Sequence, residues 1–459
     1  MGLLIKNGEI VTGDSRYHAD IYVESETITR IGSDLDVPPD TKVIDASGKY
    51  VFPGFIDPHV HVYLPFMSTF AKDTHETASI AALVGGTTTY IEMCCPSRLD
   101  DALEGYHLWK SKAEGKSACD YSFHMSVTKY GPETESQLRE IVADGINSFK
   151  IFLSYKNFFG VEDGEMYETL TLAKKLGVIT TAHCENAELV SRLQASLLAA
   201  GKTGSEWHEP SRPESVEAEG TNRFATFLDN TGATGYVVHL SCEPALKAAM
   251  AAKSKGTKLF IESVLPHFLL DKRHAERQGL EGMKHVMSPP LRDARNHQIL
   301  WNALQAGFID TVGTDHCPFD TEQKLMGTAA FTQIPNGIPG LEERVNLLYT
   351  YGVKRGSLDI HRFVNAASTN AARIFGLFPR KGTIAVGSDA DLVIYDPNYR
   401  GNLSVKTQHT NNDYNGFEGM EIEGRPSTVT VRGKVQVVDG KFVGEKGLGR
   451  QLKREPVHF

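Results

Sequence analysis

Hydrophobic and polar positions follow two different rhythms along the chain. Near both ends the apolar runs are short, rich in β-branched and aromatic residues, and separated by polar or glycine-containing turns, a pattern typical of β-strands. A hairpin turn is predicted at Asp439-Gly440, after the last of these runs. The runs are residues 3–5, 19–23 and 27–31 near the start, and 391–395, 427–432 and 434–438 near the end.

Neither end of the chain is long enough to bury a core by itself. We therefore predict that residues 1–53 and 375–445 pair into one small β-sandwich domain. This arrangement would bring the first and last strands of the chain together.

The middle of the chain alternates short apolar runs with helical patterns, which indicates βα units and a parallel sheet. We predict an α/β fold in which residues 54–374 form a (β/α)8 TIM barrel. A doubly wound open sheet is the alternative, although no glycine-rich phosphate-binding motif follows any strand, so nucleotide binding gains no support. The predicted strands are residues 52–57, 87–93, 121–127, 148–153, 178–183, 235–240, 258–263 and 309–315.

Charge and composition exclude several classes of partner. The chain has 48 Lys and Arg against 57 Asp and Glu, a formal charge of −9, which argues against nucleic acid or an anionic membrane. No apolar run approaches the ~18 residues of a membrane span, and the start of the chain does not resemble a signal peptide. The six cysteines form no CxxC pair, so we expect reduced thiols and a cytoplasmic protein.

Candidate metal ligands stand where the predicted strands end. His59 and His61 are two residues apart, so on a strand their imidazoles share one face and could bind one ion. His183, His239 and Asp315 each end another strand. Each of these residues considered alone has an ordinary structural interpretation: the histidines as packing residues and the aspartate as a helix cap. Because barrel enzymes carry their reactive groups at these ends, the conjunction predicts a metal site.

Lys150 lies inside an otherwise apolar run, residues 149–153. Lysine is almost never fully buried unless it is paired. It could extend out of the barrel end or pair with a carboxylate. Alternatively, burial beside cations could lower its pKa, so that the neutral amine adds carbon dioxide and becomes a carbamate able to bridge two metals. Composition leaves these interpretations open.

Several motifs together resemble those of the cyclic amidohydrolases, specifically the D-hydantoinase/dihydropyrimidinase branch. The resemblance covers nearly the whole chain, and no metal ligand of the family pattern is missing. The matching segments are residues 53–61 (PGFIDPHVH), 148–150 (SFK), 181–185 (TAHCE), 238–241 (VHLS), 287–292 (MSPPLR), 313–316 (GTDH), 382–384 (GTI) and 387–393 (GSDADLV).

The resemblance implies a site with two divalent metal ions, usually zinc, although manganese or cobalt would suit the same ligands. By the family pattern, one ion is held by His59, His61, carboxylated Lys150 and Asp315. The other is held by Lys150, His183 and His239, with a hydroxide between the two ions. A homotetramer is also implied.

The resemblance further implies hydrolysis of the cyclic amide of 5-monosubstituted hydantoins and 5,6-dihydropyrimidines to N-carbamoyl amino acids, with D-selectivity. Asp315 would act as general base and then general acid. Tyr155 would stabilise the oxyanion through its hydroxyl. Ser288 and Asn336 would hold the ring through their backbone groups.

The segment after His61 bears on the substrate. Dihydroorotases resemble this pattern but place an arginine there to bind a substrate carboxylate, whereas residues 62–66 (VYLPF) contain no cation. We therefore expect an apolar wall for the ring substituent, although the phenylalanines could instead be packing residues under a loop. The proposed wall residues are Tyr63, Leu64, Phe66, Phe152, Phe158 and Phe159.

Two other functions remain open. An allantoinase would use the same chemistry on a cyclic ureide, and a non-catalytic scaffold of this fold would lack metal. Residues 446–459 are expected to reach a neighbouring subunit or to form a loose tail. Three cysteines close to metal ligands are interpreted as buried packing residues: Cys184, Cys242 and Cys317.

Overall fold

Eight parallel strands form a barrel at the centre of the molecule, in a computed structural model that describes residues 2–457. The order β17-β16-β15-β14-β13-β12-β11-β8 confirms the predicted barrel. The His61 amide donates to the His316 carbonyl at 2.7 Å and the Asp315 amide to the His59 carbonyl at 3.0 Å, so the first and last strands meet. The strands are β8 Phe55–Val60, β11 Thr87–Cys94, β12 Asp120–Ser126, β13 Ser148–Phe152, β14 Ile179–His183, β15 Gly235–Val237, β16 Leu259–Val264 and β17 Thr311–Gly313.

Helices cover the outside of this barrel, so nearly all strand residues are buried on both faces. This double burial explains why the strands read as continuous apolar runs. Helix ends follow local capping chemistry: the Thr74 hydroxyl accepts the Thr77 amide at the start of α1, and Gly177 ends α4 with φ +68°. The helices are α1 His75–Val84, α2 Ala102–Ala113, α3 Pro132–Ala143, α4 Asp163–Leu176, α5 Ala187–Ala199, α6 Glu214–Thr231, α7 Glu243–Ser254, α8 Leu265–Leu269, α9 Leu280–Met283, α10 Arg295–Ala306, α11 Thr321–Leu325, α12 Arg344–Leu347, α13 Ile360–Val364 and α14 Asn370–Ile374.

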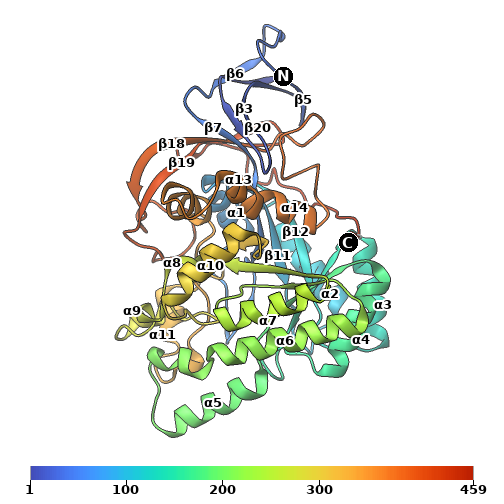
Figure 1. Cartoon of the computed structure of the whole chain (residues 1–459), viewed down its shortest axis with the longest axis vertical. Helices are drawn as coiled ribbons and strands as arrows, with labels where there is room; N and C mark the ends of the chain where they lie inside the picture. The colour runs from blue at the N-terminus through green and yellow to red at the C-terminus, as the bar shows by residue number, and fades with distance from the viewer. Residues whose placement is uncertain (1, 458–459) are drawn as a thin grey trace.

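The two chain ends form a separate pair of sheets, as predicted, with early and late strands side by side in Figure 1. Strand β7 pairs antiparallel with β18, where Val51 lies opposite Ile394. The first sheet has the order β5-β4-β1-β6 and the second β21-β20-β19-β18-β7-β2-β3. Their strands are β1 Leu3–Lys6, β2 Glu9–Val11, β3 Arg16–His18, β4 Asp20–Glu24, β5 Thr27–Gly32, β6 Lys42–Asp45, β7 Tyr50–Pro53, β18 Leu392–Asn402, β19 Glu421–Val431, β20 Lys434–Val438 and β21 Lys441–Phe442.

One predicted strand, residues 52–57, is wrong as a single element. The structure divides it into β7 of the sandwich and β8 of the barrel, with Gly54 between them. A Cβ at Gly54 would lie 2.1 Å from the Thr88 hydroxyl oxygen, so the close approach of the two segments requires glycine. The exact domain boundaries at residues 53–54 and 374–375 stay a prediction.

The C-terminal segment packs along its own barrel. The Tyr121 amide donates to the Arg450 carbonyl at 3.0 Å, and the Leu452 amide donates to the Tyr121 carbonyl at 2.7 Å. Arg454 is buried against β12 and β13. The loose-tail alternative is therefore wrong for these residues, while a contact with a neighbouring subunit stays a prediction.

The sandwich contacts the amino-terminal ends of the barrel strands. The Gly54 amide, just before β8, donates to the Asp391 carbonyl at 2.7 Å. The Lys381 Nζ lies 2.6 Å from Asp120, at the start of β12, and 2.7 Å from Asp391. These contacts leave the carboxyl ends of the strands for the functional site. Among the described residues, no helix combines the length and apolar character needed to cross a membrane.

Candidate metal centre

The carboxyl ends of the barrel strands converge on one cavity. All the predicted metal ligands, the predicted ring-binding residues and four of the six proposed wall residues line this cavity. Cys317 and Gly337 line it as well. The predicted residues found here are His59, His61, Leu64, Phe66, Lys150, Phe152, Tyr155, Phe159, His183, His239, Ser288, Asp315 and Asn336.

His59, His61 and Asp315 form a compact group in which one ligand atom from each lies within 4.8 Å of the others. The Asp315 Oδ1 lies 3.0 Å from the His59 Nε2 and 3.1 Å from the His61 Nε2. His59 comes from β8, His61 follows it, and Asp315 follows β17, so the group forms where the barrel closes. Two imidazoles and a carboxylate at this separation are ligands typical of zinc and similar ions.

Burial and neighbouring charge act against each other in this group. Burial lowers the pKa of His59, but the carboxylates of Asp315 and Glu262 outweigh it and raise the pKa to about 9. Burial raises the pKa of Asp315, but the adjacent histidines hold it well below its usual value. The two side chains thus stabilise each other as an ion pair, which a bound cation would replace.

Lys150 is fully buried on β13, and no described residue forms a hydrogen bond with its Nζ. The Nζ lies 4.9 Å from the centre of the Phe152 ring. Burial lowers the pKa of the amine, with Asp315 opposing this effect. Lys150 therefore neither reaches solvent nor pairs directly with a carboxylate among the described residues, so two of the alternatives left open by the sequence are wrong.

His183 and His239 line the same cavity, with ring centres 4.6 Å apart, and the His239 ring centre lies 5.5 Å from that of His59. The His183 Nε2 lies 2.6 Å from Glu185, while the His239 Nδ1 is buried with no hydrogen-bond partner. Burial lowers the pKa of both imidazoles. Neutral imidazole is the form that binds metal, so this pair is suited to hold an ion.

Three residues at the cavity have left-handed backbone: Tyr155 with φ 56°, His239 with φ 40° and Asp315 with φ 50°. Non-glycine residues in this region carry a strain of about 1–3 kcal/mol each. Such strain persists only where the surrounding structure holds the residue in place. Its concentration at one cavity is typical of a functional site.

Two supporting carboxylates were missed by the sequence analysis. The Glu262 Oε1, from β16, lies 2.8 Å from the His59 Nδ1 and accepts the His239 backbone amide at 3.0 Å. Glu185 supports His183 in the same way. A glutamate inside the otherwise apolar strand at residues 259–264 was the signal for Glu262. Carboxylates behind ligating histidines fix the orientation of the imidazole ring.

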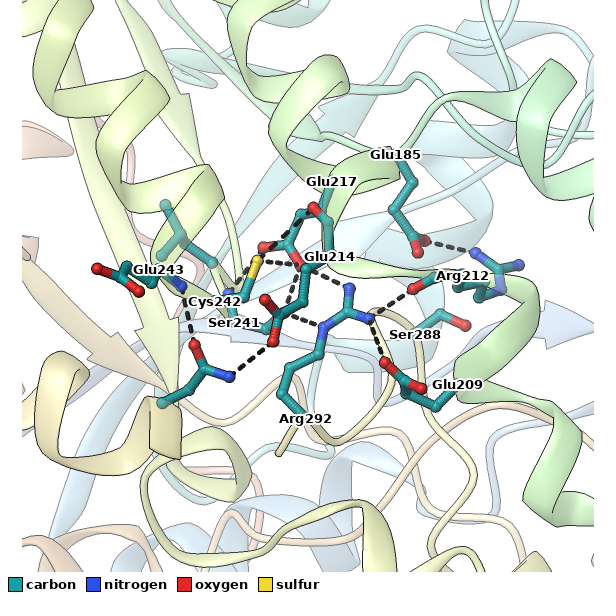
Figure 2. Close-up of polar contacts among 12 residues, drawn as sticks. Glu185, Glu209, Arg212, Glu214, Glu217, Ser241, Cys242, Glu243, Ser288 and Arg292 are labelled. Carbon is teal, nitrogen blue, oxygen red and sulfur yellow. Dashed lines mark hydrogen bonds and ion pairs between the residues drawn. The ribbon is translucent and has the colours of Figure 1, made fainter. Parts of the chain in front are cut away.

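A buried polar network lies behind these ligands, and Figure 2 shows its arrangement. Arg212 pairs with Glu185, so the partner of His183 is itself held by a cation. The guanidinium of Arg292 donates to the Ser241 hydroxyl at 2.9 Å and to Glu217 at 2.8 Å. The network thus ties the segments that follow β14 and β15 to the loop that carries Arg292.

The donor set fits a pair of cations. Three atoms are buried and have no hydrogen-bond partner within residues 2–457: the Lys150 Nζ, the His61 Nδ1 and the His239 Nδ1. Buried polar atoms are almost always satisfied in native proteins, so orphaned atoms around one cavity indicate a bound group. A carbamate on Lys150 would also supply the anionic oxygen ligands that an amine lacks.

Tyr155, Ser288 and Asn336 lie together at the mouth of the cavity. The Asn336 Nδ2 donates to the Ser288 hydroxyl at 3.0 Å, and the Tyr155 hydroxyl faces both residues. Burial raises the pKa of Tyr155, so its hydroxyl stays protonated and can donate a hydrogen bond. The Tyr155 ring centre is 5.3 Å from that of His183.

Aromatic rings form one wall of the cavity. Phe159 stacks on Phe66 at 6.0 Å and on Phe152 at 5.1 Å between ring centres, and Leu64 lines the same cavity. All four side chains are at least nine-tenths buried. The Tyr155 ring adjoins this wall, with its centre 5.3 Å from that of Phe66 and 5.9 Å from that of Phe152, so the cavity combines apolar and hydrogen-bonding groups.

Two residues predicted for this wall lie elsewhere. The Tyr63 ring packs against Trp109 at 5.1 Å and does not line the cavity. Phe158 is 39% exposed and lines neighbouring hollows outside the cavity. The prediction was wrong for both because the chain leaves regular strand geometry after His61 and after Phe152, so alternation no longer fixes the direction of a side chain.

The cysteines near the metal ligands are buried thiols. Cys184 and Cys242 pack in the core, and Cys317 lines the cavity. Burial raises the pKa of all three. A protonated thiol is a poor metal ligand and nucleophile, which fits the packing role that the sequence predicted.

Comparison with known proteins gives consistent matches over the whole chain. Residues 50–436 match the model of the amidohydrolase family. The chain is 42% identical to D-hydantoinase of Geobacillus stearothermophilus, covering 99% of this chain and 97% of the relative. It is 39% identical to dihydropyrimidinase of Rattus norvegicus, covering 99% and 89%.

A solved structure is also close in both sequence and fold. The D-hydantoinase (dihydropyrimidinase) from Thermus sp. superposes with a TM-score of 0.99 at 78% identity, covering all of both chains. At this identity, the similarity extends well beyond the general barrel fold.

Proposed function

Because the chain belongs to the amidohydrolase family, in its D-hydantoinase/dihydropyrimidinase branch, we propose that its substrates are 5-monosubstituted hydantoins and 5,6-dihydropyrimidines. It is a hydrolase of cyclic amides. The products would be N-carbamoyl amino acids. No cation follows His61 in residues 62–66, which supports rings without a carboxylate.

One observation carries the proposal: a fully buried lysine, with no hydrogen-bond partner among the described residues, lines the same cavity as two groups of candidate ligands. The Lys150 Nζ is orphaned, with His59, His61 and Asp315 in one group and His183 and His239 in the other. A structural barrel has no need of this costly arrangement, because an unpaired buried amine is unfavourable.

We assign the ligands accordingly. His59, His61 and Asp315 would hold one divalent ion, His183 and His239 the other, and a carbamate on Lys150 would bridge them. Zinc is the proposed metal, because imidazole and carboxylate ligands suit it. When bound, the ions would lower the pKa of a water and polarise the amide carbonyl.

The remaining steps belong to the side chains of the chain itself. The Asp315 carboxylate would take the proton of the attacking water and pass it to the leaving ring nitrogen. The Tyr155 hydroxyl would donate a hydrogen bond to the oxygen that becomes negative. Its raised pKa supports this role, because the hydroxyl stays protonated at neutral pH.

Recognition of the ring would fall to the polar mouth of the cavity. The backbone groups of Ser288 and Asn336 would hold the amide N–H and C=O of the ring. The side chains of Leu64, Phe152 and Phe159 would contact the substituent at position 5. Binding energy would therefore come both from hydrogen bonds to the ring and from apolar contacts with the substituent.

We also propose D-selectivity, a homotetramer and a cytoplasmic location. The first two rest on the family resemblance. The third is supported by six cysteines that all lie buried as free thiols, the state that a reducing compartment maintains.

A kinetic panel with a metal assay tests the proposed function. Dihydrouracil, hydantoin, D-phenylhydantoin and L-phenylhydantoin are compared with allantoin, with the products identified by mass. We expect N-carbamoyl products from the first three and about two metal ions per chain. Turnover of allantoin alone would indicate an allantoinase, and a folded protein without stoichiometric metal would indicate a scaffold.

A further inference from the structure

Lys324 is a second fully buried lysine, and the catalytic scheme above gives it no role. It lies on α11, in the loop that follows β17 and Asp315. Its side chain is 0% exposed. Burial, opposed only by Cys317, lowers the pKa of its amine to about 7, so keeping a charge here is costly.

The Lys324 amine donates to three backbone carbonyls and forms no ion pair among the described side chains. The acceptors are Pro335 at 2.7 Å, Gly337 at 2.8 Å and Val286 at 3.1 Å. An ammonium group has three N–H donors, so these three acceptors match its full capacity. Lys381 shows the contrast: it is equally buried but contacts three carboxylates, Asp120, Asp389 and Asp391.

The three carbonyls belong to the two segments that carry the ring-binding residues. Pro335 and Gly337 flank Asn336, and Val286 precedes Ser288 by two residues. The Gly337 amide also donates to the Val286 carbonyl at 2.9 Å. Lys324 therefore joins the segment around Ser288 to the segment around Asn336 at their point of contact.

Further contacts hold both segments in place. A Cβ at Gly337 would lie 2.2 Å from the Cys317 carbonyl oxygen, so only glycine allows the approach to the loop after Asp315. Beyond Ser288, Arg292 anchors the same segment to Glu217 and Ser241 (Figure 2). Ser288 thus lies between two cationic contacts along its segment. Arg292 on one side is paired with a carboxylate, whereas Lys324, which binds the Val286 carbonyl on the other side, is not.

Recognition of the ring by backbone groups requires that the backbone itself is held in position. The side chains around it must therefore provide that support. An error of about 1 Å in the placement of a binding group can cost ~100-fold in rate. Lys324 binds three carbonyls of the two segments and belongs to the loop that follows Asp315. It therefore fixes the ring-binding groups relative to the reacting centre.

We propose that Lys324 is a positioning residue for ring recognition, which sets the spacing between the backbone groups of Ser288 and Asn336. This inference rests on the proposed function, since it assumes that these two residues hold the substrate ring. It assigns to Lys324 no contact with the substrate.

The test compares K324M and K324Q with wild type, using K381M as the matched buried-lysine control. In K324M, we expect the KM for hydantoin and dihydrouracil to rise about tenfold or more, with a smaller fall in kcat and unchanged metal content. K324Q keeps two N–H donors, so its KM should lie between those of wild type and K324M. K381M should lower the melting temperature while leaving KM unchanged.

The outcomes separate positioning from simple structural support. Folded K324M with an unchanged KM, or a KM change matched by K381M, would overturn the inference. If K324M does not fold, K324Q decides in the same way. If wild type hydrolyses none of the rings, the proposed function fails and takes this inference with it; active wild type with an unmoved KM refutes the inference alone.

Discussion

The His59 Nδ1 lies 2.8 Å from the Glu262 Oε1, and both side chains are fully buried. The same carboxylate oxygen accepts the backbone amide of His239 at 3.0 Å. One glutamate therefore holds candidate ligands from both halves of the proposed metal centre. With its carboxylate partner on Nδ1, the His59 ring presents Nε2 to the cavity.

Glu262→Gln should weaken metal binding by about 10- to 100-fold, because the amide orients the imidazole less firmly than a carboxylate does. Titration with a competing chelator measures this affinity. Glu342→Gln is the control, since it alters a carboxylate–histidine pair with His409 away from the cavity. Equal affinities for E262Q and E342Q would contradict the assigned role of Glu262.

The carbamate on Lys150 has a direct signature. Native mass spectrometry of active, metal-loaded enzyme should show the added mass of one carbon dioxide. Lys150→Ala should lose activity by at least ~100-fold, the scale seen when one member of a catalytic unit is removed. A short carboxylic acid such as propionate should partly restore it by supplying the missing oxygen ligands.

Lys150→Arg is the matched control for that rescue. Arginine keeps the positive charge and fills the site, but it cannot carry a carbamate, so propionate should not restore its activity. An unmodified lysine in active, metal-loaded enzyme would rule out the carbamate.

Shrinking the aromatic wall should change substrate preference. Phe159→Ala and Leu64→Ala should reduce kcat/KM for D-phenylhydantoin by about 10- to 100-fold, because one hydrophobic contact contributes roughly 1–3 kcal/mol to discrimination. Unsubstituted hydantoin should be affected much less. Phe158→Ala serves as the comparison outside the cavity. Equal losses on both substrates would show that the wall only supports packing.

Glu343 should make stability depend on pH. Burial, with the charge of Glu342 adding to it, raises the pKa of Glu343 from 4.5 to about 7. The folded state therefore holds this proton more tightly, and the stability it contributes is complete below pH 4.5 and lost as pH rises through 7. Glu343→Gln should gain up to about 3 kcal/mol relative to wild type between pH 5 and 8.5.

The melting temperatures of E343Q and wild type at pH 5 and at pH 8.5 measure this difference in stability. The exposed substitution Glu421→Gln controls for general effects of charge removal. A constant difference between E343Q and wild type across the range would show that Glu343 titrates normally.

The C-terminal segment should contribute to stability through Arg454. Its Nε donates to the Ser122 hydroxyl at 2.8 Å and its Nη2 to the Ser148 hydroxyl at 3.0 Å. Arg454→Ala would leave buried polar groups unsatisfied, at a cost of about 2–4 kcal/mol. The neighbouring substitution Lys453→Ala removes only an exposed ion pair with Asp144 and should cost less than ~1 kcal/mol. Equal melting temperatures for the two variants would contradict this assignment.

The sequence predicted the barrel and the ligand positions because both depend on local patterns. Apolar runs mark the strands, and reactive residues at their ends must meet when the strands are parallel. His59 and Asp315 come together for this reason, although they are 256 positions apart in the sequence.

What the sequence did not predict depends on long-range geometry. The position of Glu262 inside a strand marks it as unusual, but only the closed barrel shows that its partner is His59. Tyr63 lies beyond the regular part of its strand, so no periodicity indicates that it turns toward Trp109. The packing of Arg454 involves a partner more than 300 residues earlier, and the polar sequence around it gives no sign of burial.

The pairing of Val51 with Ile394 has a consequence for synthesis in the cell. The first strands leave the ribosome long before their partners are synthesised. Their apolar faces and edges therefore stay unpaired while the whole barrel is translated. Exposed strand edges and apolar surfaces favour misfolding and chaperone binding. The two sheets of the small domain therefore cannot be completed until strands β18 to β21 have been synthesised.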